Sequence, residues 1–426
     1  MRRAPSLIEF PRYPIIAGTA LLAVGVTVAW WAKFDVTPLL ETPMIRRGEL
    51  WRLVTSIFPH LDVLHLAFNV YWLWVFGTLL EKTFGHLKTA AFILLFAVGS
   101  SSLEFAFSTG GAGLSGVGYG LFGLLWILSR RDQRFCDAID ARTIQLFVAW
   151  FFFCIVLTVT NIMPVGNIAH GVGGVLGILT GYVITLPQRR APFAFAIGAV
   201  LVFGVWGATL GRPMVNLSRQ AGYEEGKLGY DALVANRDAE AVQWFREAVI
   251  YQPKVAGFWY DLGIAQQRQK DLTAALAAYR KAGELGDSQA QNYLGQVYDH
   301  GSEGLARKDE AQALLWYRKA ADQGVTGAQN NVAWAYATSS DPAIRNPSAA
   351  LEYAYKAVQA TKDKPEPHYL DTLAEAYYVN QKYAEAVAME QQAIALESRE
   401  NGSVFEESLK KYQRALDGHR REARKR

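Results

Sequence analysis

Ser115 and His170 are the two residues whose types and surroundings best fit catalytic chemistry. Ser115 lies in a Gly-Leu-Ser-Gly sequence and His170 in an Ala-His-Gly sequence, and each is close to the start of an apolar stretch. A hydroxyl beside an imidazole forms a nucleophile with its general base, the pair that carries out acyl transfer. No Asp or Glu within the apolar stretches is placed to orient His170, so the sequence predicts a dyad rather than a triad.

Further polar residues fit the same reaction. His65 and Asn69 are four residues apart and therefore share one face of a helix. Acyl transfer needs donors for the oxyanion, and these two side chains and the backbone N–H group of Ser115 are candidates. Tyr119 follows Ser115 by four residues and could stack on the His170 imidazole. Taken singly, His170 could be a hydrogen-bonded core histidine, and His65 and Asn69 could simply hold helices together.

Long charge-free stretches identify the elements that must hold these residues. Residues 143–188 contain no charged residue, and neither do 14–32, 105–129 and 191–211. A helix needs about 20 apolar residues to cross the hydrocarbon core of a bilayer. The sequence therefore predicts an all-α, polytopic membrane bundle. Its seven expected spans are at about residues 14–33, 64–81, 87–107, 115–129, 144–162, 168–186 and 192–210.

Glycines predict how the two candidate catalytic helices meet. One set repeats every four residues along the sixth span, at Gly173, Gly177 and Gly181. A comparable set lies on the fourth span, at Gly116, Gly120 and Gly123. Small residues at this spacing let two membrane helices approach closely. If the two faces meet, the Ser115 hydroxyl comes within reach of the His170 imidazole.

Charge divides the chain of 426 residues into two halves. Residues 1–211 hold 15 Lys/Arg and 10 Asp/Glu, whereas residues 212–426 hold 28 and 29. With a cytoplasmic N-terminus, eleven Lys/Arg fall on the inner side of the spans and four on the outer side, which predicts that orientation. Seven spans then place residues 212–426 outside the cytoplasm. The net charge of +4 does not favour nucleic-acid binding, and two cysteines, Cys136 and Cys154, exclude a disulfide scaffold or a zinc cage.

The second half repeats itself with a period near 34 residues. Gly263 follows Gly229, and Tyr279 follows Phe245, at that interval. The pattern resembles tetratricopeptide repeats, and the unit at 290–324 resembles the variant with a longer loop between its helices. About five helix pairs are expected over 220–416, followed by a basic tail at 417–426. Such stacks supply a concave surface, so we expect protein or peptide partners, although a plain spacer is the alternative.

The membrane half resembles a larger known pattern. Residues 1–190 are similar to the rhomboid family of intramembrane serine proteases. The matching motifs, in family order, are Glu49-x-Trp51-Arg52, His60, His65-x-x-x-Asn69, Glu81-Lys82, Gly113-Leu114-Ser115-Gly116 with Tyr119, and Ala169-His170-x-x-Gly173-x-x-x-Gly177. A departure is Pro59 before His60, in the first loop.

The resemblance implies a role for each motif. It implies a six-helix core at 14–190 after a cytoplasmic segment at 1–13, with Ser115 as nucleophile and His170 as general base. His65, Asn69 and the Ser115 amide would form the oxyanion hole. Trp51 and Arg52 would belong to a membrane-embedded first loop, Glu81 would be structural, and 191–211 would be a seventh helix that some members carry. The family needs no metal or nucleotide.

Two functions follow from these expectations. The first is an intramembrane serine endopeptidase of the cell membrane that cuts single-pass membrane proteins within or next to their spans. Its repeat domain would bind substrates or adaptor proteins. The alternative is a non-catalytic rhomboid-like adaptor that holds membrane clients. Inactive relatives typically lose the serine or the histidine, and this chain retains both, which favours the enzyme.

Overall fold

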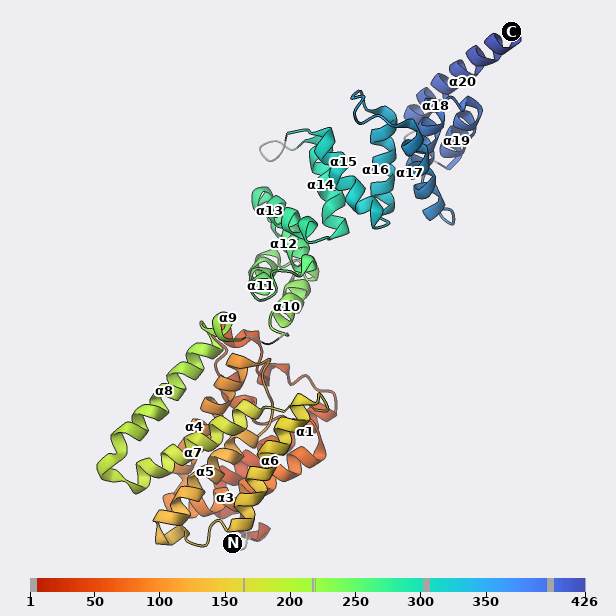
Figure 1. Ribbon diagram of the computed structural model, residues 1–426. Coiled ribbons are helices and arrows are strands. Elements are labelled where there is room, and N and C mark those ends of the chain that lie inside the picture. The colour runs from red at the N-terminus through yellow and green to blue at the C-terminus, as the bar shows by residue number, and fades with distance from the viewer. Residues whose placement is uncertain are drawn as a thin grey trace. The chain divides into compact units, whose positions relative to one another are not determined.

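The computed structural model describes residues 6–163, 165–216, 218, 220–301, 307–396 and 402–425. These described residues form helices and connecting segments without any strand, as the all-α prediction requires (Figure 1). The chain divides into two compact units, Met1–Glu224 and Glu225–Arg426.

The first unit holds a helix at each expected span. The long helices are α1 (Pro14–Trp31), α3 (Val63–Phe84), α4 (His86–Phe107), α5 (Ser115–Arg131), α6 (Ala141–Val159), α7 (Asn167–Thr185) and α8 (Arg190–Ala208). Short α-helices are α2 (Arg52–Thr55) and α9 (Arg212–Val215), and the 3-10 helices are η1 (Leu7–Arg12), η2 (Thr37–Leu39), η3 (Pro43–Arg47), η4 (Gln133–Phe135) and η5 (Pro187–Arg189). Six of the long helices have the length and apolar composition to cross a membrane. The exception, α5, has 17 residues and is largely buried among the others.

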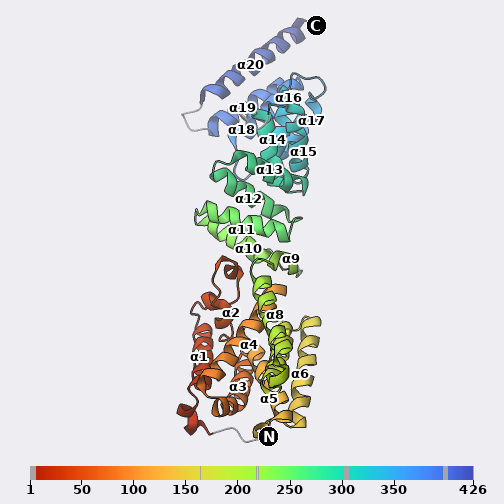
Figure 2. The ribbon, with the colours of Figure 1, turned by 90° about the vertical axis from the view of Figure 1, so that its left-hand side faces the viewer.

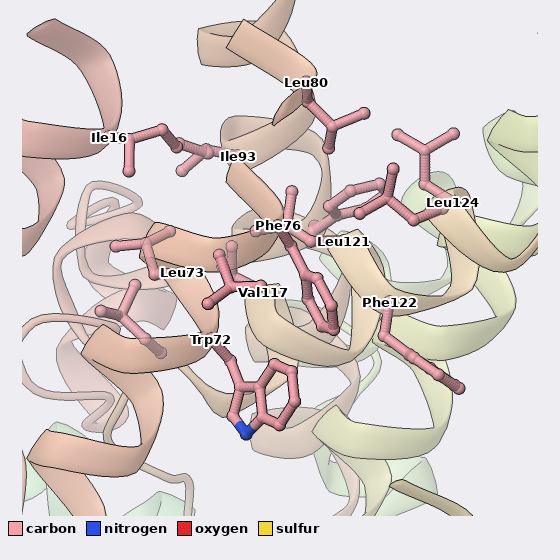
Figure 3. Packing of buried hydrophobic residues seen from close by; sticks show 14 of the residues in the cluster. Ile16, Trp72, Leu73, Phe76, Leu80, Ile93, Val117, Leu121, Phe122 and Leu124 are labelled. Atoms are coloured by element: carbon pink, nitrogen blue, oxygen red, sulfur yellow. The ribbon is translucent and has the colours of Figure 1, made fainter. Parts of the chain in front are cut away.

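The core of this unit lies between α3 and α5. Figure 3 shows Leu73 and Phe76 of α3 packed near Val117 and Leu121 of α5, and all four side chains are buried. Large apolar side chains are also exposed on the outside of the unit, on α1, α6 and α8, Phe195 of α8 being 78% exposed. A surface of this kind suits lipid, because hydrocarbon tails solvate apolar side chains as well as a protein core does.

The two glycine faces meet, as the sequence predicts. A Cβ atom at Gly173 would overlap the carbonyl oxygen of Gly116, and one at Gly177 would overlap the carbonyl oxygen of Gly120. A Cβ at Gly123 would likewise overlap the Gly174 carbonyl oxygen. The backbones of α5 and α7 are therefore in direct contact, which larger side chains would prevent.

Glu81 of α3 ties the start of α1 to the bundle. Its two carboxylate oxygens accept hydrogen bonds from the backbone N–H groups of Ile15 and Ile16, each at 3.0 Å. The His86 ring nitrogen Nδ1 lies 2.6 Å from the same carboxylate. A buried carboxylate at the positive end of a helix satisfies amides that have no partner within the helix. Glu81 is thus part of the framework of this unit.

The second unit is a stack of helix pairs. In its described residues five pairs follow one another along the chain, and each stacks on the next in both views (Figures 1 and 2). The pairs are α10/α11 (Tyr223–Val234, Asp238–Tyr251), α12/α13 (Ala256–Arg268, Leu272–Glu284), α14/α15 (Ser288–His300, Glu310–Asp322), α16/α17 (Thr326–Thr338, Pro347–Ala360) and α18/α19 (Pro367–Val379, Tyr383–Leu396).

The repeat pattern has a direct packing cause. In the first three pairs a glycine of one helix receives an aromatic ring of its partner helix. The matched positions are Gly229 with Phe245, Gly263 with Tyr279, and Gly295 with Tyr317. Any Cβ at these glycines would lie within 3.0 Å of the ring. The periodic glycines and aromatics of the sequence are therefore the two sides of one contact within each pair.

A single long helix, α20 (Gly402–Lys425), follows the fifth pair. Lys411 Nζ donates to both Glu375 carboxylate oxygens at 2.8 and 2.7 Å, and the Tyr412 hydroxyl donates to one of them at 2.7 Å. These bonds fasten α20 to α18. The residues expected as a basic tail, 417–426, continue this helix to Lys425, and 417–423 are exposed.

The α5–α7 contact makes a prediction about stability. Gly177→Ala should lower the free energy of unfolding by about 1–3 kcal/mol. The new methyl group would overlap the Gly120 carbonyl, and the backbone of α5 would have to move to make room for it. Gly118→Ala is the matched control, since nothing lies within 4 Å of a Cβ there. Thermal unfolding of the purified proteins in detergent measures the difference. Equal unfolding temperatures for the two variants would contradict the packing described.

Candidate active site

The α5–α7 contact brings together the starts of two helices. Ser115 is the first residue of α5, and His170 lies in the first turn of α7. A Cβ at Gly116, next to Ser115, would lie 3.3 Å from the carbonyl oxygen of Ala169, next to His170. Ser115 is half-buried and His170 is 4% exposed. Two residues 55 positions apart in the sequence thus occupy neighbouring helix ends.

The His170 ring is oriented by stacking. Tyr119 lies against it with ring centroids 4.8 Å apart and an interplanar angle of 26°, the arrangement expected from the spacing of Tyr119 and Ser115. The Tyr119 hydroxyl donates to the Phe147 carbonyl at 3.0 Å, and this bond holds the Tyr119 ring in its position against His170. His170 Nδ1 is buried without a hydrogen-bond partner. Among the described residues no hydrogen bond joins Ser115 to the imidazole, a contact that commonly tightens only when substrate binds.

Glu104 holds the backbone that carries His170. Its Oε2 accepts from the Ala169 N–H group at 2.9 Å, and its Oε1 accepts from the Ser108 hydroxyl at 2.8 Å. The carboxylate belongs to α4 and satisfies the amide end of α7, as Glu81 does for α1. This contact was not expected from the sequence. The available signal was a charged residue inside a predicted span, which is expensive unless it has a partner.

His60 fixes the segment that precedes Ser115. Its Nε2 accepts from the Leu114 N–H group at 3.2 Å, and its Nδ1 lies 2.8 Å from the Phe58 carbonyl. Burial lowers the pKa of His60 to about 4, so the ring is neutral at pH 7 and Nδ1 carries the proton. One residue earlier, the Gly113 N–H group donates to the Ser56 carbonyl at 3.0 Å. The loop before α3 therefore sets the position of the residues that lead into α5.

The first loop is built around two buried ionisable side chains, Arg52 and Glu41. Arg52 donates to Glu49 at 2.6 Å and to the Leu40 carbonyl at 3.1 Å. Glu41 accepts from the Gly111 N–H group at 2.7 Å, and burial raises the pKa of Glu41 to about 8. Trp51, in contrast, is 52% exposed. Arg52 is thus a framework residue of the loop, and the role of Glu41 was not expected from the sequence.

Three groups are candidate donors to an oxyanion. Gly113 has φ +115°, a backbone conformation that glycine adopts readily and other residues rarely do. A Cβ atom at this position would lie 2.8 Å from Cε1 and 3.1 Å from Nε2 of His65. Asn69 is 5% exposed, and its Nδ2 is buried without an acceptor. Buried donors of this kind are rare and call for an explanation. The Ser115 amide has no hydrogen-bond acceptor among the described residues. Donors of these kinds are the groups that stabilise an oxyanion in acyl transfer.

No cluster of three or more His, Cys, Asp or Glu side chains that could hold a metal ion occurs in the described ranges. The candidate site groups are the Ser115 hydroxyl, the imidazoles of His65 and His170, the Asn69 amide and backbone donors. Their chemistry is that of a nucleophile with a base and oxyanion donors, that is, acyl transfer.

Comparison with known families agrees with this geometry. Residues 47–187 match the Rhomboid domain family, and residues 288–325 and 326–361 match the Sel1 repeat. The chain is therefore a multi-pass membrane protein that carries a rhomboid domain. Its second unit carries Sel1 repeats, which are tetratricopeptide-like, so the resemblances seen in the sequence are confirmed.

Known relatives cover the membrane half. The chain is 30% identical over 167 residues to rhomboid protease GlpG of Salmonella paratyphi A, and 30% identical over 172 residues to that of Salmonella newport. Each match covers 38% of this chain and 57% of the relative, so the chain spans little more than half the length of these proteins.

Two solved structures of repeat proteins are weakly similar to the chain. A Sel1 repeat protein from Oxalobacter formigenes is 18% identical, with a TM-score of 0.32, over 47% of this chain and 92% of its own. A protective antigen of uropathogenic Escherichia coli with an SLR fold is 17% identical, with a TM-score of 0.30, over 88% of each chain.

The unpaired donors predict an effect on the reactivity of Ser115. Asn69→Ala and His65→Ala should each slow phosphonylation of Ser115 by a fluorophosphonate by about 10²-fold, because a donor to the developing charge on the phosphonyl oxygen is lost. Tyr71→Phe on the same helix α3 is the control, since its side chain is 55% exposed. The measurement is the rate of labelling at several reagent concentrations. If both variants react as fast as the wild type, neither side chain belongs to the oxyanion hole.

Proposed function

We propose that the protein is an intramembrane serine endopeptidase that cleaves single-pass membrane proteins within or next to their spans. The observation that carries the proposal is the backbone contact of α5 and α7, with Ser115 and His170 at its end. The buried and unpartnered Nδ2 of Asn69 supports an oxyanion hole. The rhomboid domain and relatives named as rhomboid proteases support the same activity.

The reaction begins when His170 takes the proton from the Ser115 hydroxyl. The Ser115 oxygen attacks the carbonyl carbon of the substrate peptide bond, and the carbonyl oxygen becomes an oxyanion. His65, Asn69 and the Ser115 amide donate hydrogen bonds to that oxyanion, which lowers the barrier. The C–N bond then breaks, and the leaving amine takes the proton from His170. Water attacks the acyl-enzyme in the same way, with His170 again as base, and releases the new carboxyl group.

Neighbouring residues keep this geometry in place. Tyr119 holds the imidazole plane by stacking, Glu104 holds the amide end of α7, and His60 holds the Leu114 amide just ahead of the nucleophile. Each acts through a backbone or a ring rather than on substrate. A dyad of this kind relies on such supports, because no carboxylate is bonded to the imidazole in the described residues.

The geometry of a helix restricts the substrate. The carbonyl groups of an intact transmembrane helix are engaged in hydrogen bonds and are shielded by side chains. A substrate span must therefore unwind locally before Ser115 can reach a carbonyl carbon. Small residues and helix-breaking residues near the cleavage site favour that unwinding.

The dyad makes the first prediction of this mechanism. Ser115→Ala and His170→Ala should each abolish cleavage of a transmembrane test substrate, and the double variant should be no worse than either, because the two residues act as a unit. Fluorophosphonate labelling should disappear in Ser115→Ala. Ser129→Ala is the matched control, since Ser129 is a serine of the same helix whose hydroxyl donates only to the Trp126 carbonyl.

Full cleavage by either single variant would overturn the mechanism. If the fluorophosphonate does not label the wild type at all, the result would instead favour a rhomboid-like adaptor that holds membrane clients without cutting them. Membrane proteomics of wild-type cells against Ser115→Ala cells identifies the substrates as single-pass proteins that accumulate uncut.

We place the protein in the cell membrane with a cytoplasmic N-terminus and an extracytoplasmic repeat unit. The excess of Lys and Arg on one side of the spans supports this orientation. Stacked Sel1 repeats present extended surfaces to other proteins. The repeat unit would therefore bind ectodomains of substrates or adaptor proteins on the side to which the starts of α5 and α7 open.

The orientation can be tested with one native cysteine as the internal reference. Cys136 is exposed in the segment between α5 and α6, and three spans separate it from the exposed residue Lys227. An impermeant maleimide applied to intact cells, or to spheroplasts where an outer membrane exists, should label a Lys227→Cys variant and leave Cys136 unlabelled. Both should react after lysis. Labelling of Cys136 alone in intact cells would refute the orientation.

A further inference from the structure

The segment that follows α8 binds the C-terminal end of α4 through two side chains. The Arg212 side chain is 1% exposed, and its guanidinium carbon lies 4.0 Å from the centre of the Phe105 ring. Arg212 Nε donates to the Phe105 carbonyl at 3.1 Å, and Nη2 donates to the Ser108 carbonyl at 3.1 Å. Asn216 Nδ2 donates to the same Ser108 carbonyl at 2.7 Å. We call Arg212 and Asn216, with the two carbonyls that they hold, the α4 clamp.

The clamp satisfies groups that the helix itself leaves unpaired. The last carbonyls of an α-helix have no partner within the helix, and they carry its negative end. A guanidinium there supplies both several donors and a favourable charge. The helix α8 is already close to the same end of α4, because a Cβ at Gly204 would overlap the Ser102 hydroxyl and one at Gly207 would lie 3.0 Å from the Ala106 Cβ.

Hydrogen bonds of Ser108 connect the clamp to the segments that precede both candidate catalytic residues. The Ser108 hydroxyl lies 2.8 Å from the Glu104 carboxylate and 2.8 Å from the Glu104 backbone carbonyl oxygen, and the carboxylate accepts from the Ala169 N–H group beside His170. The same hydroxyl accepts from the Gly110 N–H group at 3.0 Å, in the segment that leads to Ser115. Ser108, which Arg212 and Asn216 hold, is therefore bonded to Glu104, which supports the start of α7, and to the segment that leads to α5.

We propose that Arg212 and Asn216 are positioning residues for the Ser115–His170 site. The inference rests on the proposed protease function and extends it beyond the matched rhomboid domain, which ends at residue 187. By fixing the Ser108 backbone, the clamp fixes the direction of its hydroxyl and so the Glu104 carboxylate and the start of α7. The segment that leads into the repeat unit is thereby part of the catalytic framework.

The test uses the purified full-length protein in detergent. Arg212→Ala and Asn216→Ala remove donors of the clamp, and Arg212→Lys keeps the cation without the fork of donors. Arg190→Ala is the matched control, because Arg190 is exposed at the opposite end of α8. Three quantities are measured: the rate of fluorophosphonate labelling, and the kcat and KM for a transmembrane test substrate. The kcat is expressed per Ser115 site titrated with the reagent, so that unfolded protein does not contribute.

We expect Arg212→Ala to lower kcat per titrated site and the labelling rate by about 10- to 100-fold, as small misplacements of catalytic groups do. KM should change less than about threefold, since the clamp lies outside the substrate contacts. Asn216→Ala should have a smaller effect in the same direction, and Arg212→Lys should recover part of the loss. Arg190→Ala should match the wild type.

The two proposals fail in different ways. If the wild type shows no labelling that depends on Ser115, the protease function is overturned and the clamp's role falls with it. If the wild type is labelled and Arg212→Ala reacts equally fast per site, only the clamp is overturned. A merely structural clamp would lower the number of titrated sites without changing kcat per site. If Arg212→Ala does not fold, Asn216→Ala, which loses one bond to the Ser108 carbonyl, decides by the same criterion.

Discussion

The direct backbone contact between α5 and α7 is the constraint on which the site depends. Within a membrane no hydrophobic effect drives one helix onto another, so close packing of small residues has to do so. At Gly173 and Gly177 the approach leaves no room for a Cβ, and the opposing atoms are carbonyl oxygens of Gly116 and Gly120. The contact runs up to the starts of both helices. The glycines that follow Ser115 and His170 have no side chains to keep the two helices apart. The serine and the histidine therefore become neighbours.

Polar side chains then provide hydrogen-bond partners for backbone groups that close packing leaves unpaired. Helix ends expose amides and carbonyls that hydrocarbon cannot satisfy. Glu81 and Glu104 each accept from the amide end of another helix, and Arg212 donates to the carbonyl end of α4. His60 holds the Leu114 amide in the same manner. These buried ionisable side chains thus hold backbone groups in place.

Two of the buried unpaired atoms belong to candidate site residues. His170 Nδ1 and Asn69 Nδ2 are buried without partners, as are the indole nitrogens of Trp72 and Trp126, whereas Glu81, Glu104 and Arg212 are hydrogen-bonded to backbone. A buried polar group without a hydrogen-bond partner raises the free energy of the folded state. In a catalytic site such a group can gain its partner when the transition state forms, which lowers the barrier of the reaction. The repeat unit follows a different logic, in which glycine and an aromatic ring such as Gly263 and Tyr279 recur to pack each pair.

The sequence by itself determined the helices, the glycine faces, the repeat period and the shared helix face of Ser115 and Tyr119. Each of these depends on residues at a fixed short spacing, and helix geometry converts that spacing into a shared face. Only the tertiary structure decided the partners of Glu41, His60, Glu104 and Arg212. Glu104 meets an amide 65 residues away, and Arg212 meets a carbonyl 107 residues away. No local period encodes such contacts, because the acceptor or donor is backbone, which every residue possesses.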